Sequence, residues 1–188
     1  MRNMNLRRTE NRLQCSMSRF EEPIKYISDL HADFSLFPKS PGAREVFELI
    51  LQLNQAVVGI SVSSVSVETP SALSRFIQAL ERMHSWIADI PPTKQERRFG
   101  NKSFRSWLDR VALYAQELLG PVIGPELERK GALVELVPYF LSSFGDKTRI
   151  DYGSGHELTF VALICCLVKL GVFSKEDFSR VVLKLFKT

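Results

Sequence analysis

One apolar segment decides most of what this chain of 188 residues can fold into. From Leu158 to Val168 its only conventionally polar residue is Thr159. A helix that is apolar on every side has to lie inside a bundle of other helices. Lys169 and Gly171 end the segment well short of the roughly 20 apolar residues that a bilayer crossing needs. We therefore predict a core helix of a helical protein and no membrane partner.

The loop before this segment concentrates reactive side chains. Within nine positions it contains Arg149, Asp151, Tyr152, His156 and Glu157, with Gly153 and Gly155 between them. Glycines let the backbone turn tightly and approach a ligand closely. The N-terminus of a helix also presents N–H groups without partners and a partial positive charge. The junction therefore predicts a site for an anion or a nucleotide.

A purely structural role for the same loop stays open. Ser154 and Glu157 have the spacing of a capping box, in which the two side chains take up the N–H groups that a phosphate needs. Glu157 also repels a phosphate unless Arg149, Lys147 or a metal ion offsets its charge. Gly-x-Gly is a weak signal by itself, and the loop has neither a Walker A motif nor a dinucleotide fingerprint.

The net charge of +4 comes from the N-terminus of the chain. Residues 1–19 contain five arginines and one glutamate, so the remaining residues are neutral as a whole. A neutral body does not favour a nucleic-acid partner. We expect a disordered basic tail over residues 1–19 and one helical domain over residues 20–188.

The cysteines and the N-terminus bear on the cellular compartment. Three cysteines in 188 residues indicate a reducing environment, and two of them, Cys165 and Cys166, lie in the apolar segment as small hydrophobes. The three histidines are too scattered for metal-ligand spacing. No apolar region of a secretory signal follows the N-terminus. We expect a cytoplasmic protein, with the nucleus as a second compartment.

Apolar residues recur at helical spacing in two segments ahead of the loop. In the first, which Ser40 and Pro41 begin, the predicted buried stripe is Phe47, Ile50, Leu51, Asn54, Val57 and Val58. In the second, the stripe is Leu73, Phe76, Ile77, Leu80, Met83, His84 and Ile87. His84 is then an interior histidine, and Asn54 is either a buried polar residue or a ligand contact. Between the two, residues 60–68 alternate valine with serine and are expected to form a connection.

Two further helices are predicted from caps and spacing. Trp86 falls off the preceding stripe and either packs against another subdomain or offers an aromatic face to a partner. Asn101 can cap a helix whose apolar residues are Phe104, Trp107, Leu108, Val111, Ala115 and Leu118. Basic and polar residues gather at its start: Arg97, Arg98, Asn101, Lys102 and Arg105. They form either a solvated cluster or part of a loop that closes over a ligand. Ser174 caps a final helix.

Three stretches together point to a family. They read Trp-Ile-Ala-Asp-Ile-Pro-Pro from Trp86, Arg-Phe-Gly-Asn-Lys-Ser-Phe-Arg-Ser-Trp from Arg98, and Thr-Arg-Ile-Asp-Tyr-Gly-Ser-Gly-His-Glu from Thr148. In order and spacing they resemble the phosphotyrosyl phosphatase activator family, also called the protein phosphatase 2A activators. The similarity covers about residues 20–186 and leaves the basic tail outside.

The resemblance implies an all-α fold with core, lid and linker subdomains. It also implies ATP and magnesium in a cleft, association with the catalytic subunit of protein phosphatase 2A, and peptidyl-prolyl isomerase activity on a proline-containing peptide. The nucleotide-binding residues implied are Arg98, Gly100, Asn101, Lys102, Arg149, Asp151, Tyr152, Gly153, Gly155, His156 and Glu157. Asp151 and Glu157 would hold magnesium through water, with the nucleotide. Trp86, Asp89, Pro91 and Pro92 would contact the peptide or the phosphatase.

One departure from the family qualifies these expectations. Family members continue past the last residue of this chain, and their later Trp-Gly-Leu-Asp-Asp motif has no counterpart here, so the expected domain is incomplete at its C-terminal side. Two alternatives to an active isomerase therefore stand. One is a non-catalytic helical module that binds the phosphatase, and the other is an inactive truncated copy.

Overall fold

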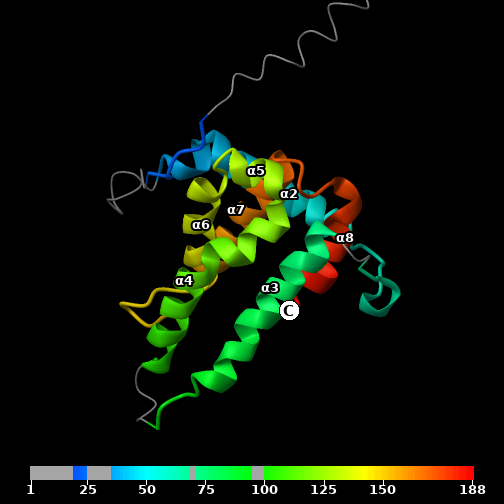
Figure 1. Ribbon diagram of the computed structural model, residues 1–188. Helices are drawn as coiled ribbons and strands as arrows, with labels where there is room; N and C mark the ends of the chain where they lie inside the picture. The colour runs from blue at the N-terminus through cyan, green and yellow to red at the C-terminus, as the bar shows by residue number, and fades with distance from the viewer. Residues whose placement is uncertain (1–18, 25–34, 68–70, 95–99) are drawn as a thin grey trace, which may run out of the picture.

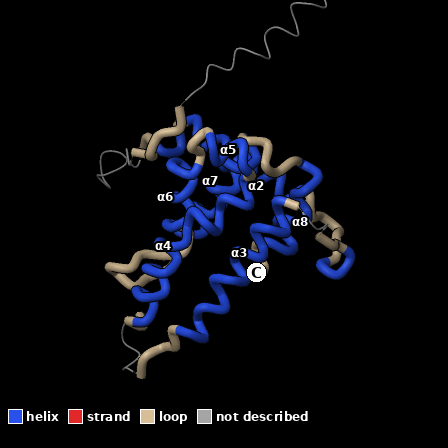
Figure 2. The backbone as a smooth tube through the Cα atoms, in the orientation of Figure 1, coloured by secondary structure: helices blue, strands red, loops and turns tan. Residues whose placement is uncertain are grey.

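The structure, a computed structural model, describes residues 19–24, 35–67, 71–94 and 100–188 (Figure 1). Within these ranges the chain is helical and has no β-strand (Figure 2). The α-helices are α2 (Pro41–Gln55), α3 (Ala72–Asp89), α4 (Ser103–Ile123), α5 (Pro125–Arg129), α6 (Leu133–Ser142), α7 (Ser154–Lys169) and α8 (Phe178–Arg180). Short segments are η1 (Phe37–Lys39), η2 (Val62–Ser64), η3 (Lys175–Asp177) and the π-helix η4 (Val181–Leu185). The predicted all-α fold is confirmed.

Helix α7 is the core helix that the sequence predicts. It packs against α6 and α2, while α4 packs against α3 and α6 (Figure 1). Leu163, Ile164 and Leu167 in its C-terminal half are fully buried, whereas Leu158 near its start is 38% exposed. The helix therefore runs from the loop at the surface into the centre of the bundle.

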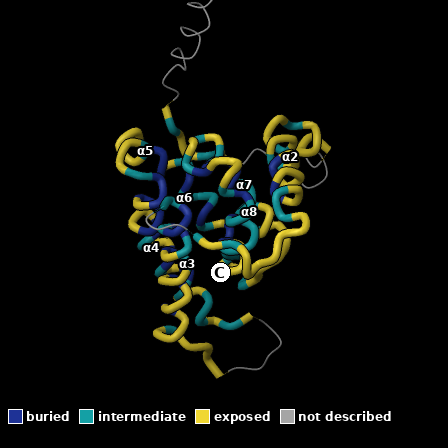
Figure 3. The backbone as a smooth tube through the Cα atoms, turned by 90° about the vertical axis from the view of Figure 1, so that its right-hand side faces the viewer, coloured by how far each residue is buried: buried dark blue, intermediate teal, exposed yellow. Residues whose placement is uncertain are grey.

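Aromatic rings join the helices around α7. The ring of Phe76 in α3 lies 6.2 Å from that of Phe140 in α6, 5.8 Å from Phe160 in α7 and 6.4 Å from Phe173 beyond α7, measured between centroids. Phe76 and Phe140 have no exposed surface. Figure 3 shows this buried interior where α6 and α7 meet. Burial of large aromatic rings favours the folded state, so these contacts stabilise the bundle.

Helices α3 and α4 form an antiparallel pair whose connected ends project from the rest of the bundle (Figures 1 and 3). The indole N–H of Trp107 in α4 donates to the backbone oxygen of Met83 in α3, at 2.9 Å. This hydrogen bond satisfies the one polar atom of a partly buried ring. The pair thus holds the end of α3 next to the start of α4.

The predicted stripe of α2 is wrong in part, because the helix has apolar residues on two faces. Leu49 and Leu53 are buried toward the core, whereas Phe47 and Leu51 are 61% and 53% exposed. Asn54 is exposed as well, so it is not a buried polar residue. Helical spacing finds both faces equally well, and only the packing against α7 and α8 selects one of them.

The stripe of α3 is also shifted. His84 is exposed, so the prediction of an interior histidine is wrong. Ile87 is 45% exposed and Trp86 only 8% exposed. The buried positions Leu73, Phe76, Ala79, Met83 and Trp86 follow the face that meets α4, and a bulky indole can fill the contact near the projecting end.

Local signals at helix ends are largely confirmed. Ser40 accepts a hydrogen bond from the N–H of Ala43 at the start of α2, and Ser174 shares a capping box with Asp177 ahead of α8. The side-chain oxygen of Asn101 accepts from the N–H of Ser103, the first residue of α4. Among the described residues no helix is long and apolar enough to cross a bilayer.

Candidate functional site

The loop between α6 and α7 folds around the carboxylate of Asp146. Its Oδ1 accepts hydrogen bonds from the N–H groups of Thr148 and Arg149, both at 2.8 Å. The backbone N–H of Asp146 donates to the backbone oxygen of Asp151 at 3.0 Å, and the backbone oxygen of Asp146 accepts from the N–H of Ile150 at 2.8 Å. The Arg149 amide is the largest of the influences that lower the pKa of Asp146. The carboxylate is therefore the internal anchor of the loop.

Two residues of the loop have a left-handed backbone conformation. Gly145 has φ 116°, and a side chain there would meet the backbone oxygen of Asp151 and the ring of Phe104. Ile150 has φ 55°, although a β-branched residue is seldom found there. Such strain costs about 1 to 3 kcal/mol and is typical of functional sites, where the surrounding contacts hold it in place.

The charged side chains of the loop pair with one another. The Nε of Arg149 lies 2.8 Å from Oδ2 of Asp151, and its Nη1 lies 3.5 Å from Oδ2 of Asp146. The hydrogen bond with Asp151 is the main reason that the pKa of Arg149 is raised. Both carboxylates offset the arginine, so in this arrangement the loop is close to neutral rather than basic.

His156, in the first turn of α7, joins the loop to the end of α6. Its Nδ1 lies 2.6 Å from the backbone oxygen of Ser142, and because a carbonyl only accepts, Nδ1 carries the hydrogen. Its Nε2 then faces Oδ1 of Asp151 at 3.8 Å. The ring of Tyr152 stacks on the imidazole at 5.9 Å and remains 58% exposed. Burial, followed by the charge of Glu157, raises the pKa of Tyr152.

The predicted capping box at the start of α7 is wrong. Gly153 is the N-cap, Ser154 is already the first helical residue, and no side chain caps this end. Gly155 and Glu157 are exposed in the first turn, and Glu157 bonds to the oxygen of Gly153 only through its backbone N–H. The N–H of His156 also donates to the Gly153 oxygen, so without a capping side chain the N–H groups of Ser154 and Gly155 are the ones that stay available to an anion.

Of the nucleotide-binding residues predicted in the second family stretch, Gly100 is the one that the structure places against the loop. Gly100 lies against Ile150 so closely that a side chain at Gly100 would overlap the Ile150 backbone oxygen and side chain. Asn101 is turned to Thr93 instead, with which it shares hydrogen bonds of 2.9 to 3.2 Å. Lys102 is exposed at the start of α4, and Arg98 lies outside the described residues. The structure thus brings one of these predicted residues to the loop.

The residues predicted to contact a partner lie at the projecting end of α3. Trp86 is covered by Arg82 and Arg110, whose guanidinium carbons lie 5.7 and 5.8 Å from the ring centroid, and by Tyr114. Asp89 pairs with Arg110 at 2.7 Å. The backbone oxygen of Pro91 accepts from the hydroxyl of Ser103, and Pro92 is exposed. Trp86 is therefore largely buried against α4, and a partner contact for all four residues stays a prediction.

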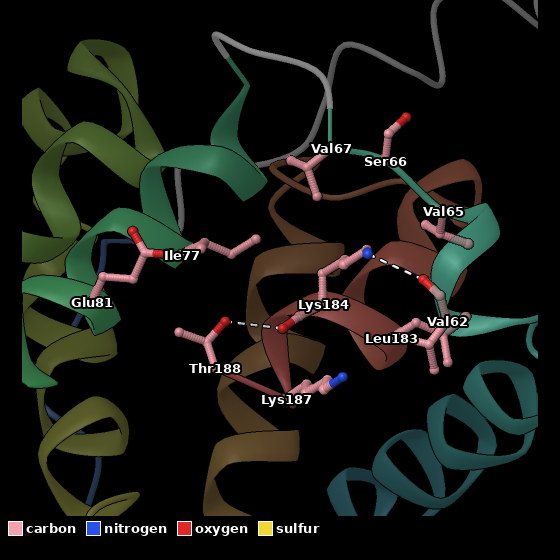
Figure 4. Close-up of a pocket in the computed structure, with 10 residues that line it drawn as sticks. All are labelled: Val62, Val65, Ser66, Val67, Ile77, Glu81, Leu183, Lys184, Lys187 and Thr188. Carbon is pink, nitrogen blue, oxygen red and sulfur yellow. Dashed lines mark hydrogen bonds between the residues drawn. The ribbon is translucent and has the colours of Figure 1, made fainter.

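Two hollows of the surface lie away from this loop. A groove of about 570 Å³ runs between residues 62–67, α3 and the end of η4 (Figure 4). Lys184 crosses it to donate to the backbone oxygen of Val62 at 3.1 Å. A second hollow of about 550 Å³ lies among α3, α4 and α5. None of the predicted site residues lines either one, and among the described residues no three His, Cys, Asp or Glu side chains are placed to hold a metal ion.

Asp146 is the functional-loop residue that we did not predict. In an Asx turn, the side chain of an aspartate accepts hydrogen bonds from backbone N–H groups a few positions further on. That signal is present in Asp-Lys-Thr-Arg at residues 146–149. The prediction above is based on the reactive side chains of residues 149–157 and does not use this signal.

Comparison with known proteins gives one consistent result. Residues 23–188 match the sequence family described as phosphotyrosyl phosphate activator (PTPA) protein. Serine/threonine-protein phosphatase 2A activator 1 of Schizosaccharomyces pombe is 33% identical over 174 residues, which are 93% of this chain and 52% of that protein. The activator of Drosophila melanogaster is 32% identical, over 82% of this chain and 38% of that protein.

A solved structure agrees with these relatives. The crystal structure of the PP2A phosphatase activator Ypa1 is similar, with a TM-score of 0.72 and 26% sequence identity, over 93% of this chain and 55% of that one. The chain thus spans about half, or less, of the length of the proteins that it matches. With a family match over most of its residues, the chain belongs to the phosphotyrosyl phosphatase activator (PTPA) family.

Proposed function

We propose that this chain activates protein phosphatase 2A by binding its catalytic subunit, and that it binds magnesium-ATP at the loop from Asp146 to Glu157. Relatives named as activators of this phosphatase support the partner. The observation that carries the site is the arrangement of the loop at an uncapped helix start, next to Gly100 of the second family stretch.

The residues of the loop fit a nucleotide. The first-turn N–H groups of α7 have no side-chain cap, which suits a phosphate. The exposed ring of Tyr152 offers a flat apolar surface. Arg149 is held by two carboxylates, so a phosphate has to compete with Asp146 and Asp151 for it. If a carboxylate of the loop held magnesium together with the nucleotide, Arg149 would be freer to pair with a phosphate.

Mg²⁺ usually keeps several waters and binds one or two carboxylates together with phosphate oxygens. Asp151 and Glu157 are the carboxylates that would hold it, and Arg149 and the α7 N–H groups would hold the phosphates. The ion would neutralise phosphate charge at the loop.

Peptidyl-prolyl isomerisation is the catalytic part of the proposal. It needs no covalent chemistry, because its barrier of about 18 to 20 kcal/mol falls when the amide is held twisted. Exposed Tyr152 is suited to contact a proline ring. The alternative is a helical module that binds the phosphatase without catalysis. An isomerisation assay on a proline-containing test peptide separates the two, since only the first accelerates the exchange.

The test of the main proposal is activation of the phosphatase itself. Inactive catalytic subunit is incubated with the chain, ATP and magnesium, and phosphatase activity is followed. Wild type is expected to raise the activity, and Asp151→Ala to weaken magnesium-dependent ATP binding about tenfold, the effect of losing one charged contact. Glu126→Gln is the control, because Glu126 lies in α5 and pairs with Lys130, one turn further on, at 2.7 Å.

Two results would count against this proposal. No activation by wild type removes the phosphatase function from this chain. Unchanged ATP affinity in Asp151→Ala removes Asp151 from the site while leaving activation to be explained by the protein contact alone.

A further inference from the structure

Arg105 in the first turn of α4 reaches across to the loop, 42 residues further along the chain. Its Nε donates to the backbone oxygen of Lys147 at 2.9 Å, and its Nη2 donates to that of Thr148 at 3.1 Å. The forked donor geometry of a guanidinium suits two acceptors side by side, which a lysine cannot match. One side chain therefore binds two consecutive carbonyl groups.

The same two peptide units are held from their other side. The oxygen of Lys147 and the N–H of Thr148 belong to one planar unit, and the oxygen of Thr148 and the N–H of Arg149 belong to the next. Arg105 binds both oxygens, while the carboxylate of Asp146 binds both N–H groups. Because each unit is planar and bound at both edges, its orientation is fixed.

Neighbouring residues of α4 strengthen this hold. Asp109, one turn after Arg105, pairs with Nζ of Lys147 at 2.9 Å. The ring of Phe104 lies against Gly145 at the other end of the turn. The first two turns of α4 thus contact one side of the loop. They hold the backbone from which Arg149 and Asp151 project and pair with each other.

We propose that Arg105 is a positioning residue for the loop: it sets the backbone from which Arg149 and Asp151 project, without contacting the ligand itself. This inference rests on the proposed function, because the ligand is the magnesium-ATP proposed above. The consequence is that the affinity of the site depends on a residue in α4.

The test compares three variants of the full chain. Arg105→Gln removes the charge and the fork, Arg105→Lys keeps the charge but not the fork, and Arg110→Gln is the matched control. Arg110 lies on the same helix and pairs with Asp89 away from the loop. For each, amide hydrogen exchange is measured by NMR at Thr148 and Arg149, the dissociation constant of magnesium-ATP by calorimetry, and the unfolding midpoint by heating.

In Arg105→Gln the two amides are expected to exchange at least tenfold faster and the dissociation constant to rise about tenfold, which corresponds to about 1.4 kcal/mol. Arg105→Lys should recover part of both. Arg110→Gln should lower the unfolding midpoint at least as much as Arg105→Gln does, yet leave the exchange of both amides and the ATP affinity unchanged. That separation distinguishes positioning from general stability.

Three outcomes overturn the inference. Unchanged exchange of the two amides in Arg105→Gln shows that the fork does not hold the loop. Faster exchange with unchanged ATP affinity shows that binding does not depend on this hold. Equal loss of affinity in Arg105→Gln and Arg110→Gln shows a merely structural effect. Failure of the proposed nucleotide function is seen separately, as absence of binding in wild type before any substitution.

Discussion

The two ends of α7 are stabilised in opposite ways. The C-terminal half is buried among apolar side chains, with Leu163, Ile164 and Leu167 fully inaccessible. The N-terminal end carries a loop held by hydrogen bonds and ion pairs between exposed groups, such as Arg149 with Asp151. Buried apolar side chains are each worth a few kcal/mol, whereas an exposed polar contact is worth about 1 kcal/mol or less.

Along one helix, the buried half is therefore expected to contribute mainly to stability, and the loop mainly to the proposed ligand binding. Changes in the buried half should lower the free energy of unfolding of the whole domain. Changes in the loop should alter ligand binding more than the free energy of unfolding, because each of its exposed polar contacts contributes little to stability. Substitutions in the buried core and in the loop test this comparison directly.

The largest effect is expected at Phe140. Its ring has no exposed surface and lies 5.0 Å from that of Phe144 and 6.2 Å from that of Phe76. Phe140→Ala leaves a cavity and should reduce the free energy of unfolding by about 3 to 5 kcal/mol, measured by urea denaturation. A loss below about 1 kcal/mol would show that the aromatic cluster is not the stabilising centre.

A smaller effect is expected at Gly145, in the loop. Alanine there would combine φ 116° with a Cβ 2.6 Å from the backbone oxygen of Asp151. Gly145→Ala should therefore destabilise the chain by about 2 kcal/mol and speed amide exchange in the loop. Gly155→Ala is the control, because nothing lies within 4 Å of a Cβ there. If both variants behave alike, the loop does not have the described conformation.

The smallest effect concerns Cys166, in the buried half. Burial, more than the nearby Glu135, raises the pKa of this thiol to about 11, compared with about 8.5 in an unfolded chain. Between these values the folded state retains a proton that the unfolded state releases, so the free energy of unfolding falls as pH rises. We expect Cys166→Ala to remove about 1 kcal/mol of that fall between pH 9 and 11, allowing for solvent screening.

Denaturant titrations of both proteins at several pH values check this. The wild-type curve should be steeper above pH 9 than the variant curve. Parallel curves would mean that the thiol titrates alike in both states and is not buried as described.

Much of the fold follows from local chemistry in the sequence. The apolar segment at 158–168, the serine caps and the helical spacing all correspond to observed elements. The choice of buried face did not follow, since α2 is apolar on two sides and Trp86 replaces Ile87 on α3. Such choices depend on which helices meet, and that information lies in contacts between distant residues.

The candidate site divides in the same way. Residues 149–157 were identified from their types and spacing, but the capping by Gly153 rather than Ser154 depends on the path of the loop. The roles of Asp146 and Arg105 arise from hydrogen bonds to backbone groups, which a side-chain pattern does not record. Residue types therefore predict a candidate site at this loop, and the structure adds the backbone contacts that support the loop.

The most direct test of the account is thermal unfolding of this chain with and without ATP and magnesium. A ligand that binds only the folded state raises its stability by mass action, about 2.7 kcal/mol at a hundredfold excess over the dissociation constant. We expect one cooperative transition whose midpoint rises with magnesium-ATP and rises less in Asp151→Ala. A cooperative transition that millimolar magnesium-ATP leaves in place would contradict the nucleotide site at the start of α7.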